Sequence, residues 1–390
     1  MGAHRIGRAA AVIGTVALCA VALASGCSSS PAPDTTGTDP AAHPSSPAAP
    51  PPGFGDTALW SIPFLSQPHI VEDGFVGVVD SSDASGSHRV QVLDDTGTPR
   101  FGVDVPADRD EFAVTSTHNR ELLITEDIDD PGSGAPATVT ARDTRTGDLV
   151  WGPVSAAGCL TGSGLLIDAD CSQTAKPAAV AAISATDGHR TDLTGAISES
   201  GGYAVTVDGD TAHVVTADTG NIAWSTDTLT PPPAAIPGTA RFVATAGNAG
   251  VVAWTIPTRP EPIQAVYRLS DAELRWISGS RSPMVMTADS SSGATMITTA
   301  DLTDDGIAVL FEQYGTRGFT ADQFPGADRF SLVGGIVYGA SDSRVTAIDA
   351  TSGRVTGTSP SAAPTAVTSN GVALAQSSDG YTAFKVIPHF

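Results

Sequence analysis

Short apolar segments separated by glycine, aspartate and serine make up most of this chain. Gly74–Val79, Gly335–Gly339 and Asn370–Leu374 share one order, in which a turn residue precedes a run of β-branched or small apolar residues. The same order recurs along the chain without the spacing of an amphipathic helix. Short strands bounded by turn residues predict an all-β fold.

The first residues follow a different pattern. Arg5 and Arg8 precede the almost wholly apolar run Ala9–Ala24, which is shorter than the ~20 residues of a membrane-spanning helix. This layout is typical of a secretory signal. Ala24–Cys27 resembles a bacterial lipobox, although Ala24 stands where leucine is commoner. The resemblance implies a signal peptide over residues 1–26 and a lipid, including palmitate, on Cys27. An ordinary signal cleavage near this point and an uncleaved membrane anchor remain alternatives.

Residues 27–53 have the composition of a tether. They are mostly Ser, Pro, Ala, Thr, Gly and Asp, and no aromatic residue occurs before Phe54. Such a segment buries too little apolar surface to offset the entropy of ordering it. Its prolines favour extended conformations, with a reach of about 80 Å at full stretch. We therefore expect a lipid-anchored, disordered stalk that holds residues 54–390 away from the extracytoplasmic side of a cell membrane.

A sequence repeat organises residues 54–390. Its clearest copy is Ala141–Trp151, and weaker copies contain Val92–Gly97, Ala182–Gly188, Val215–Trp224 and Ala347–Gly353. Stretches ending at Trp276 and around Gly318 are weaker still. The repeated positions that we assign a structural role are Ala141, Asp143, Thr146, Gly147, Trp151, Gly220, Trp224, Asp349, Gly353, Trp60 and Trp276.

Each residue type in the repeat has a structural task. Ala141 suits a strand that is buried on both faces, and Asp143 and Thr146 can hydrogen-bond the backbone of a tight turn. Gly147 suits a position with positive φ. The ring of Trp151 can cover the contact between neighbouring sheets. The repeat therefore predicts architecture and no reactive centre.

The pattern Ala-x-Asp-x-x-Thr-Gly-x-x-x-Trp resembles the PQQ-like β-propeller repeat. The resemblance covers about residues 57–388, with one complete copy. It implies a β-propeller of about eight four-stranded blades, with seven as the alternative. The expected blade starts lie near His69, Phe112, Gly158, Gly201, Arg241, Ala294, Phe330 and Pro364. We expect the strand 57–63 to pair with the last blade and close the ring, with Trp60 in the role of Trp151.

The cysteines indicate one disulfide. Cys19 leaves with the signal and Cys27 takes the lipid, so Cys159 and Cys171 remain. In an oxidising compartment this pair predicts a disulfide across a hairpin. Zinc is the weaker interpretation, because no second pair of Cys or His lies nearby in the sequence.

Catalytic motifs are scarce. Proteins that carry this repeat include quinoprotein alcohol dehydrogenases and non-enzymatic scaffold lipoproteins of outer-membrane assembly. The dehydrogenases carry adjacent cysteines, a calcium cage and a catalytic aspartate, and this shorter chain has no Cys-Cys pair. No Gly-x-Ser-x-Gly motif, paired-histidine motif or phosphate loop occurs. We expect no catalytic residue, cofactor or metal. A triad assembled from distant Ser, His and Asp stays open.

Two acidic clusters are the candidates for a cation site. Glu126–Gly132 contains four carboxylates, but Thr138 stands where an EF-hand would place its last glutamate. Asp301–Gly306 is a weaker cluster of the same kind. We interpret both as solvated acidic turns.

Charge narrows the choice of partner. The chain carries 20 basic and 42 acidic side chains, for a net charge of −22. Such a surface repels nucleic acid and anionic lipid headgroups. We expect a monomeric, non-enzymatic scaffold that binds an envelope protein or a cell-wall component. The alternatives are a quinone-dependent dehydrogenase, another envelope enzyme and a small-ligand sensor.

Overall fold

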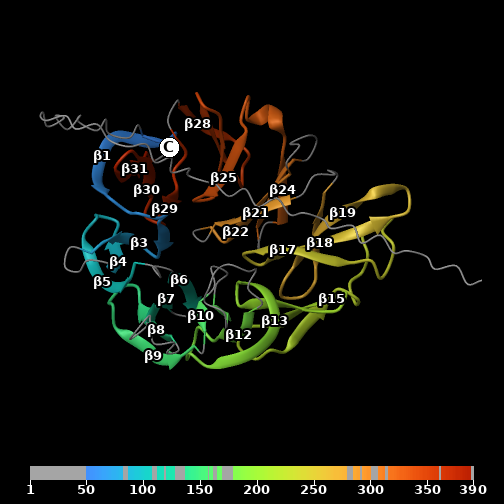
Figure 1. The fold of residues 1–390 in the computed structure, drawn as a ribbon. Coiled ribbons are helices and arrows are strands. Elements are labelled where there is room, and N and C mark those ends of the chain that lie inside the picture. The colour runs from blue at the N-terminus through green and yellow to red at the C-terminus, as the bar shows by residue number, and fades with distance from the viewer. Residues whose placement is uncertain are drawn as a thin grey trace, which may run out of the picture. The chain divides into compact units, whose positions relative to one another are not determined.

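Strands form where the sequence alternates short apolar runs with Gly, Asp and Ser turns. β3 (Gly74–Asp80) and β4 (Ser87–Asp94) are typical, since their central valines Val76, Val90 and Val92 are fully buried. Buried β-branched residues of this kind favour a pleated strand that is covered on its faces. The chain is nearly all β, as its sequence predicts (Figure 1).

The computed structural model describes residues 50–387, except 82–86, 108–111, 118–119, 128–136, 157, 161–164, 169–178, 279–283, 290–291, 300–305, 312–314 and 360–361. The chain divides into two units, residues 1–44 and 45–390. Every described element belongs to the second unit.

Antiparallel sheets follow one another along this unit. The first contains β2 (His69–Val71), β3, β4 and β5 (Pro99–Pro106). The second contains β6 (Phe112–Thr117), β7 (Arg120–Asp127), β8 (Thr138–Asp143) and β9 (Leu149–Ser155). The third contains seven strands: β10 (Cys159–Leu160), β11 (Leu166–Asp168), β12 (Ala179–Ile183), β13 (Arg190–Ser200), β14 (Tyr203–Asp208), β15 (Thr211–Thr216) and β16 (Ile222–Ser225).

Four further sheets of four strands complete the described part. They are β17 (Arg241–Ala246), β18 (Ala249–Ile256), β19 (Arg259–Arg268) and β20 (Leu274–Ile277); β21 (Met284–Asp289), β22 (Ala294–Thr299), β23 (Ile307–Phe311) and β24 (Gly315–Phe319); β25 (Arg329–Val333), β26 (Ile336–Ala340), β27 (Val345–Asp349) and β28 (Val355–Ser359); and β29 (Ala366–Val367), β30 (Val372–Ser377), β31 (Gly380–Val386) and β1 (Phe54–Ile62). A 3-10 helix, η1 (Ala321–Gln323), lies between β24 and β25.

The seven-stranded sheet is two four-stranded units that share β13. The first half of this strand pairs with β12, from Arg190↔Ile183 to Asp192↔Ala181. Its second half pairs with β14, from Ser198↔Val205 to Ser200↔Tyr203. One long strand therefore ends one unit and begins the next.

The last sheet joins the two ends of the described chain. β1 pairs antiparallel with β31, with Phe54 opposite Val386 and Ile62 opposite Tyr381. The strand predicted over 57–63 thus spans Phe54–Ile62 and pairs with the predicted partner. A pairing across more than 300 residues supplies β31 with hydrogen-bond partners on an edge that would otherwise be open.

Two predicted blade starts were misplaced. The sequence placed the sixth start near Ala294, but Ala294 begins the second strand of its sheet, and the first strand is β21. β21 was missed because it is poorly marked: Val285 is 62% exposed, and Thr287 and Ala288 also face solvent. The fourth start, predicted near Gly201, lies earlier, in the second half of β13.

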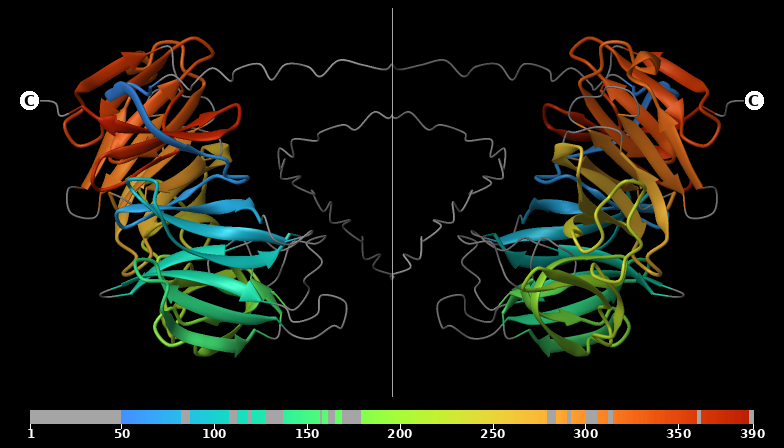
Figure 2. Two further views of the ribbon diagram at one scale, coloured as in Figure 1. Left: turned by 90° about the vertical axis from the view of Figure 1, so that its left-hand side faces the viewer. Right: turned by 90° about the vertical axis from the view of Figure 1, so that its right-hand side faces the viewer.

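The core lies between neighbouring sheets. One cluster joins Leu122 and Ile124 of β7 to Ile167 and Ala181 of the next sheet. The last sheet packs against the first in the same way, with Leu374 and Tyr381 in one cluster with Phe75 and Leu93. Figure 2 shows the sheets from the side, with neighbouring sheets turned face to face. This face-to-face succession of four-stranded units is the β-propeller fold.

One end of the sheets carries most of the tight turns. In each four-stranded unit the first-to-second strand connection and, except in the last sheet, the third-to-fourth connection lie at the same end. Contacts between neighbouring sheets link it: Gly335 N donates to Asp289 Oδ2 (2.8 Å), and Ser369 Oγ donates to Glu72 O (3.1 Å). The second bond joins the last sheet to the first.

Candidate functional site

The complete repeat copy forms the turn between β8 and β9. Asp143 Oδ1 accepts hydrogen bonds from the backbone N–H groups of Arg145 (2.8 Å) and Thr146 (3.3 Å). Gly147 adopts φ +78° and donates its N–H to Asp143 O (2.9 Å). Thr146 Oγ1 donates to Asp148 Oδ2 (2.9 Å), and Ala141 is fully buried. Asp143, Thr146 and Gly147, the polar and glycine positions of the repeat, therefore all form hydrogen bonds within the turn.

Other copies form the same turn with different residues. Gly220 donates its N–H to Thr216 O, and Gly353 donates its N–H to Asp349 O, both at 2.8 Å. Asp349 Oδ1 also accepts the N–H of Ser352 (2.5 Å). In the turn after β19, Ala272 takes the left-handed position with φ +61°. The backbone of the turn is thus kept where the glycine is lost.

Three tryptophans each join one sheet to the sheet that follows it. Trp151 Nε1 donates to Ala185 O (2.9 Å), and Trp224 Nε1 donates to Leu269 O (2.7 Å). Trp60 Nε1 donates to Asp95 O (3.1 Å), which joins the last sheet to the first. Each acceptor is the second residue of the corresponding turn in the following sheet. These indoles therefore stabilise the contacts between sheets.

Trp276 occupies a different environment. It is half-buried and packs on a cluster that includes Val251 and Ile297. At this contact between sheets, the neighbouring Arg275 donates to Phe311 O (2.8 Å) instead. At this contact the Arg275 guanidinium thus makes the hydrogen bond to the next sheet that a tryptophan makes elsewhere.

Several predicted residues lie outside the described part of the chain. Cys27 and Cys171 are among them, so lipidation and the disulfide remain predictions. Cys159 begins β10 and is buried. Most of Glu126–Gly132 and Asp301–Gly306 also lies outside the described residues, although Glu126 is buried in β7. No group of three or more potential metal ligands occurs among the residues that the structure describes.

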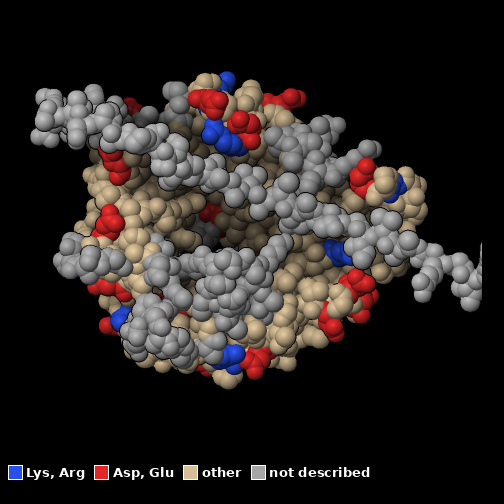
Figure 3. Space-filling view, viewed as in Figure 1, with Lys and Arg blue, Asp and Glu red and all other residues tan. Residues whose placement is uncertain are grey.

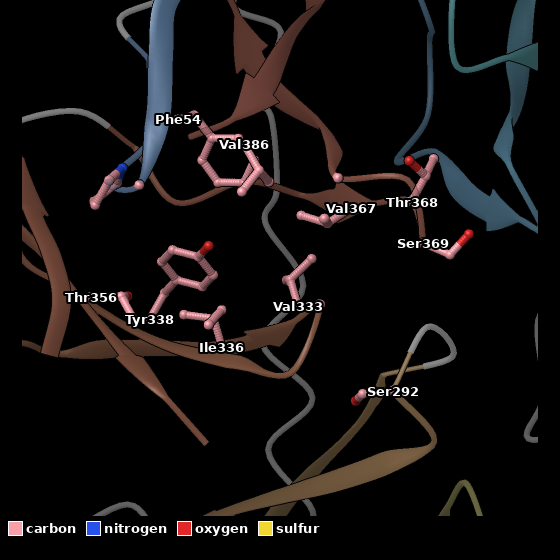
Figure 4. A pocket seen from close by; sticks show the side chains of 14 residues that line it. Phe54, Ser292, Val333, Ile336, Tyr338, Thr356, Val367, Thr368, Ser369 and Val386 are labelled. Atoms are coloured by element: carbon pink, nitrogen blue, oxygen red, sulfur yellow. The ribbon is translucent and has the colours of Figure 1, made fainter. Parts of the chain in front are cut away.

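A pocket of about 450 Å³ lies where the β25–β28 sheet meets the last sheet (Figure 4). Val333 at the end of β25 and Ile336 at the start of β26 form one side of it. Val367 and Val386 of the last sheet form another. Pro52 and Phe54, at the start of β1, also line it. The pocket therefore brings together both ends of the described chain.

Tyr338 is the largest buried side chain of this pocket that carries a polar group. It is 2% exposed, and its hydroxyl points into the space toward Phe54 and Val386 (Figure 4). The hydroxyl makes no hydrogen bond with a described residue. Burial, with a smaller contribution from the nearby Asp289 carboxylate, raises the pKa of Tyr338 above its usual value. The group is therefore a neutral phenol at physiological pH.

The lining of the pocket is uncharged among the described residues. Besides the apolar groups, Thr356, Thr368 and Ser369 contribute hydroxyl-bearing side chains. Asp289 lies close enough to affect Tyr338, but it is 4% exposed and accepts from Gly335 N and Ser292 Oγ. Sequence reasoning missed this pocket, because its residues come together only through contacts between sheets.

A second group of polar side chains lies where the first two sheets meet. Glu121 Oε2 accepts the backbone N–H of Glu72 (2.6 Å) and the Thr144 hydroxyl (3.4 Å). Arg145 forms a bidentate ion pair with Glu72, and Arg100 pairs with Asp73. Burial raises the pKa of Glu121 to about 7, although the Thr144 hydroxyl and the Arg100 charge favour the ionised form.

Charge on the visible surface is dispersed. Figure 3 shows acidic groups spaced around a hollowed centre, with a smaller number of basic groups between them. The described residues contain no helix long and apolar enough to cross a membrane.

Comparisons with known proteins give distant structural matches. No family model matches the chain, and no curated protein matches it. Among solved structures, BamB from Moraxella catarrhalis is 13% identical, with 84% of this chain and 99% of that chain covered and a TM-score of 0.34.

Two other solved structures have similar scores. A quinohemoprotein alcohol dehydrogenase from Pseudomonas putida is 13% identical, with 82% of this chain and 66% of that chain covered and a TM-score of 0.29. The β-propeller domain of the Trilobed protease from Pyrococcus furiosus is 9% identical, with 83% and 91% covered and a TM-score of 0.39. The fold assignment above rests on the sheets of this chain.

Proposed function

We propose that this chain is a lipid-anchored, extracytoplasmic β-propeller of eight four-stranded units that acts by binding a component of the cell envelope. The signal over residues 1–26 and the Cys27 lipobox support the anchor. Residues 27–53 are the stalk. The units are the six four-stranded sheets and the two units that share β13.

The observation that carries this proposal is that the repeated residues form turns and contacts between sheets. Asp143 and Gly147 are used in a turn, and Trp60, Trp151 and Trp224 are used between sheets. The most recurrent side chains of the chain thus hold sheets together. Repetition that serves packing gives a rigid platform, whose surfaces are available for a partner.

The connection to the stalk supports the same interpretation. Pro51 and Pro52 are buried, and Gly53 O accepts the N–H of Ile387 (3.0 Å). A methyl group added at Gly357 would lie 3.2 Å from Pro52 Cβ, which shows close packing against β28. The last residues of the predicted stalk, Pro51–Gly53, are therefore packed against two sheets instead of extending freely.

The charge of the chain restricts the partner. With a net charge of −22, a neutral or basic surface fits it better than an anionic one. An envelope protein or an uncharged region of the cell wall has this chemistry. Nucleic acid does not.

Metabolic labelling tests the anchor. Cells expressing the full chain would receive an alkyne fatty acid, and the chain would be compared with Cys27→Ala and with Ser29→Ala as the matched control. We expect label and membrane association for the wild type and Ser29→Ala, and loss of both for Cys27→Ala. Equal labelling of Cys27→Ala would contradict the proposal.

A further inference from the structure

The pocket between the β25–β28 sheet and the last sheet has the properties of a small-molecule site. Its volume of about 450 Å³ falls within the roughly 300–1,000 Å³ of ligand pockets. Its walls are mainly apolar, with a few hydroxyl groups among them. A mainly apolar lining with few polar groups is the usual composition of such a site.

Tyr338 gives the pocket a specific polar contact. A tyrosine presents an apolar ring and a polar hydroxyl, so a bound molecule can pack on the ring and hydrogen-bond the hydroxyl. Tyr338 is 2% exposed and its hydroxyl points into the pocket without a bond to a described residue. Tyr267, by contrast, donates its hydroxyl to Thr230 O (3.1 Å). A bound molecule would hydrogen-bond the Tyr338 hydroxyl in place of water.

The surroundings select an uncharged occupant. None of the described lining residues is Asp, Glu, Lys, Arg or His, so an ion in the pocket would lose hydration without a counter-charge from the lining. The Asp289 carboxylate, whose charge contributes to the raised pKa of Tyr338, would also repel an anion.

We propose that this pocket binds an uncharged, predominantly apolar small molecule that hydrogen-bonds the Tyr338 hydroxyl. The molecule would contact Val333 and Ile336 on one sheet and Val367 and Val386 on the other. It would also contact Phe54, so its binding would hold β1 in place next to the stalk. The proposal does not depend on lipid anchoring or on a protein partner.

Two fluorescent dyes of similar shape test the proposal. N-phenyl-1-naphthylamine is neutral, whereas 1-anilinonaphthalene-8-sulfonate carries a negative charge. The protein is the chain from residue 27 onward with Cys27→Ala, which contains the whole compact unit and needs no detergent. We expect the neutral dye to bind at one site per chain, and the sulfonate to bind at least about tenfold more weakly.

Adjacent positions on β28 provide the matched variants. Thr356 lines the pocket, whereas Val355 is 62% exposed and lies on the opposite face of the strand. Thr356→Trp would fill the pocket and weaken the neutral dye at least tenfold, while Val355→Trp would leave its affinity unchanged. Tyr338→Phe keeps the ring and removes the hydroxyl, so it would weaken the neutral dye by about three- to tenfold.

Circular dichroism and urea unfolding would first establish that each variant is folded. If Thr356→Trp fails to fold, Tyr338→Phe decides the result. Weakening confined to the two pocket variants supports the proposal. Absence of dye binding to the parent chain, equal affinity for the two dyes, or undiminished binding by the folded pocket variants overturns it.

Discussion

The indole Nε1 of Trp151 donates a 2.9 Å hydrogen bond to the carbonyl oxygen of Ala185, which lies in the next sheet. The ring of Trp151 also lies against Gly188 of the same turn, where an added Cβ would approach Cε3 to 2.6 Å. The Trp151 side chain thus makes two contacts with the next sheet: its Nε1 bonds a backbone oxygen, and its ring occupies the space that a side chain at Gly188 would fill. This contact explains why the repeat contains glycine and tryptophan together.

Replacing Trp151 should therefore destabilise the domain. Trp151→Phe removes a buried donor and leaves the Ala185 carbonyl without it, which should lower the free energy of unfolding by about 1–3 kcal/mol. Trp151→Ala should cost about 3–5 kcal/mol. Trp276→Phe is the control, since Arg275 makes the hydrogen bond at its contact. Urea unfolding measures all three, and an equal loss at Trp276 would contradict the assigned roles.

Gly188→Ala tests the second half of this contact. Gly188 and Gly238 have similar φ values, +72° and +75°, so an alanine at either meets similar backbone strain. A Cβ at Gly238 has nothing within 4 Å, whereas one at Gly188 meets the Trp151 ring. We expect both variants to lose about 1 kcal/mol, and Gly188→Ala to lose about 1–3 kcal/mol more through overpacking. Equal urea midpoints for the two variants would contradict this, because they would mean that the Trp151 ring moves aside without loss of stability.

The pH dependence of stability should contain a component from Glu121. Its pKa is about 7 in the folded chain and lies near 4.5 when unfolded, so the folded state binds the proton more tightly. Stability from this group is full below pH 4.5 and is lost as the pH rises to 7. The loss should be about 1–2 kcal/mol, because Glu121 is half-buried and partly screened by solvent.

Glu121→Gln isolates this component. An amide oxygen can still accept the Glu72 N–H, but it has no charge to lose or gain between pH 5 and pH 8. Urea unfolding at both pH values should show a wild-type decline that exceeds that of the variant. Identical declines would place the titration of Glu121 outside this range.

The pairing of β1 with β31 predicts a large effect of deletion. Removing residues 54–62 exposes the edge of β31 and takes Phe54 from its cluster with Tyr338 and Phe384. We expect loss of cooperative unfolding and association of the chain through the open edge. Deletion of residues 28–44, in the predicted stalk, is the control and should leave the urea midpoint unchanged. A monomeric 54–62 deletion with wild-type stability would contradict the role of β1.

The sequence predicted the repeated part of the fold better than its exceptions. The complete copy at Ala141–Trp151 has the expected turn, because Asp and Gly act through local backbone geometry. β21 was missed because its residues are mostly exposed and its role depends on pairing with β22. The copy that ends at Trp276 looks weak in the sequence because Ala272 stands at the glycine position, in a left-handed conformation that its residue type disfavours.

The pocket could not be predicted from sequence at all. Phe54, Tyr338 and Val367 are far apart along the chain and belong to no motif. Tyr338 looks like an ordinary strand residue, and only the packing of two sheets shows that its ring is buried and its hydroxyl points into a pocket. The chemistry of the repeat is local, whereas the chemistry of the pocket is created by the fold.

Crosslinking of the full chain in intact cells tests the central claim of binding most directly. Wild type and Cys27→Ala would be compared, and the covalent products would be identified by mass spectrometry. We predict that one envelope protein or cell-wall fragment is recovered with the wild type, and that its yield falls sharply for the unanchored variant. Recovery of the chain alone, together with a bound quinone and dye-linked alcohol oxidation by the purified protein, would contradict the account.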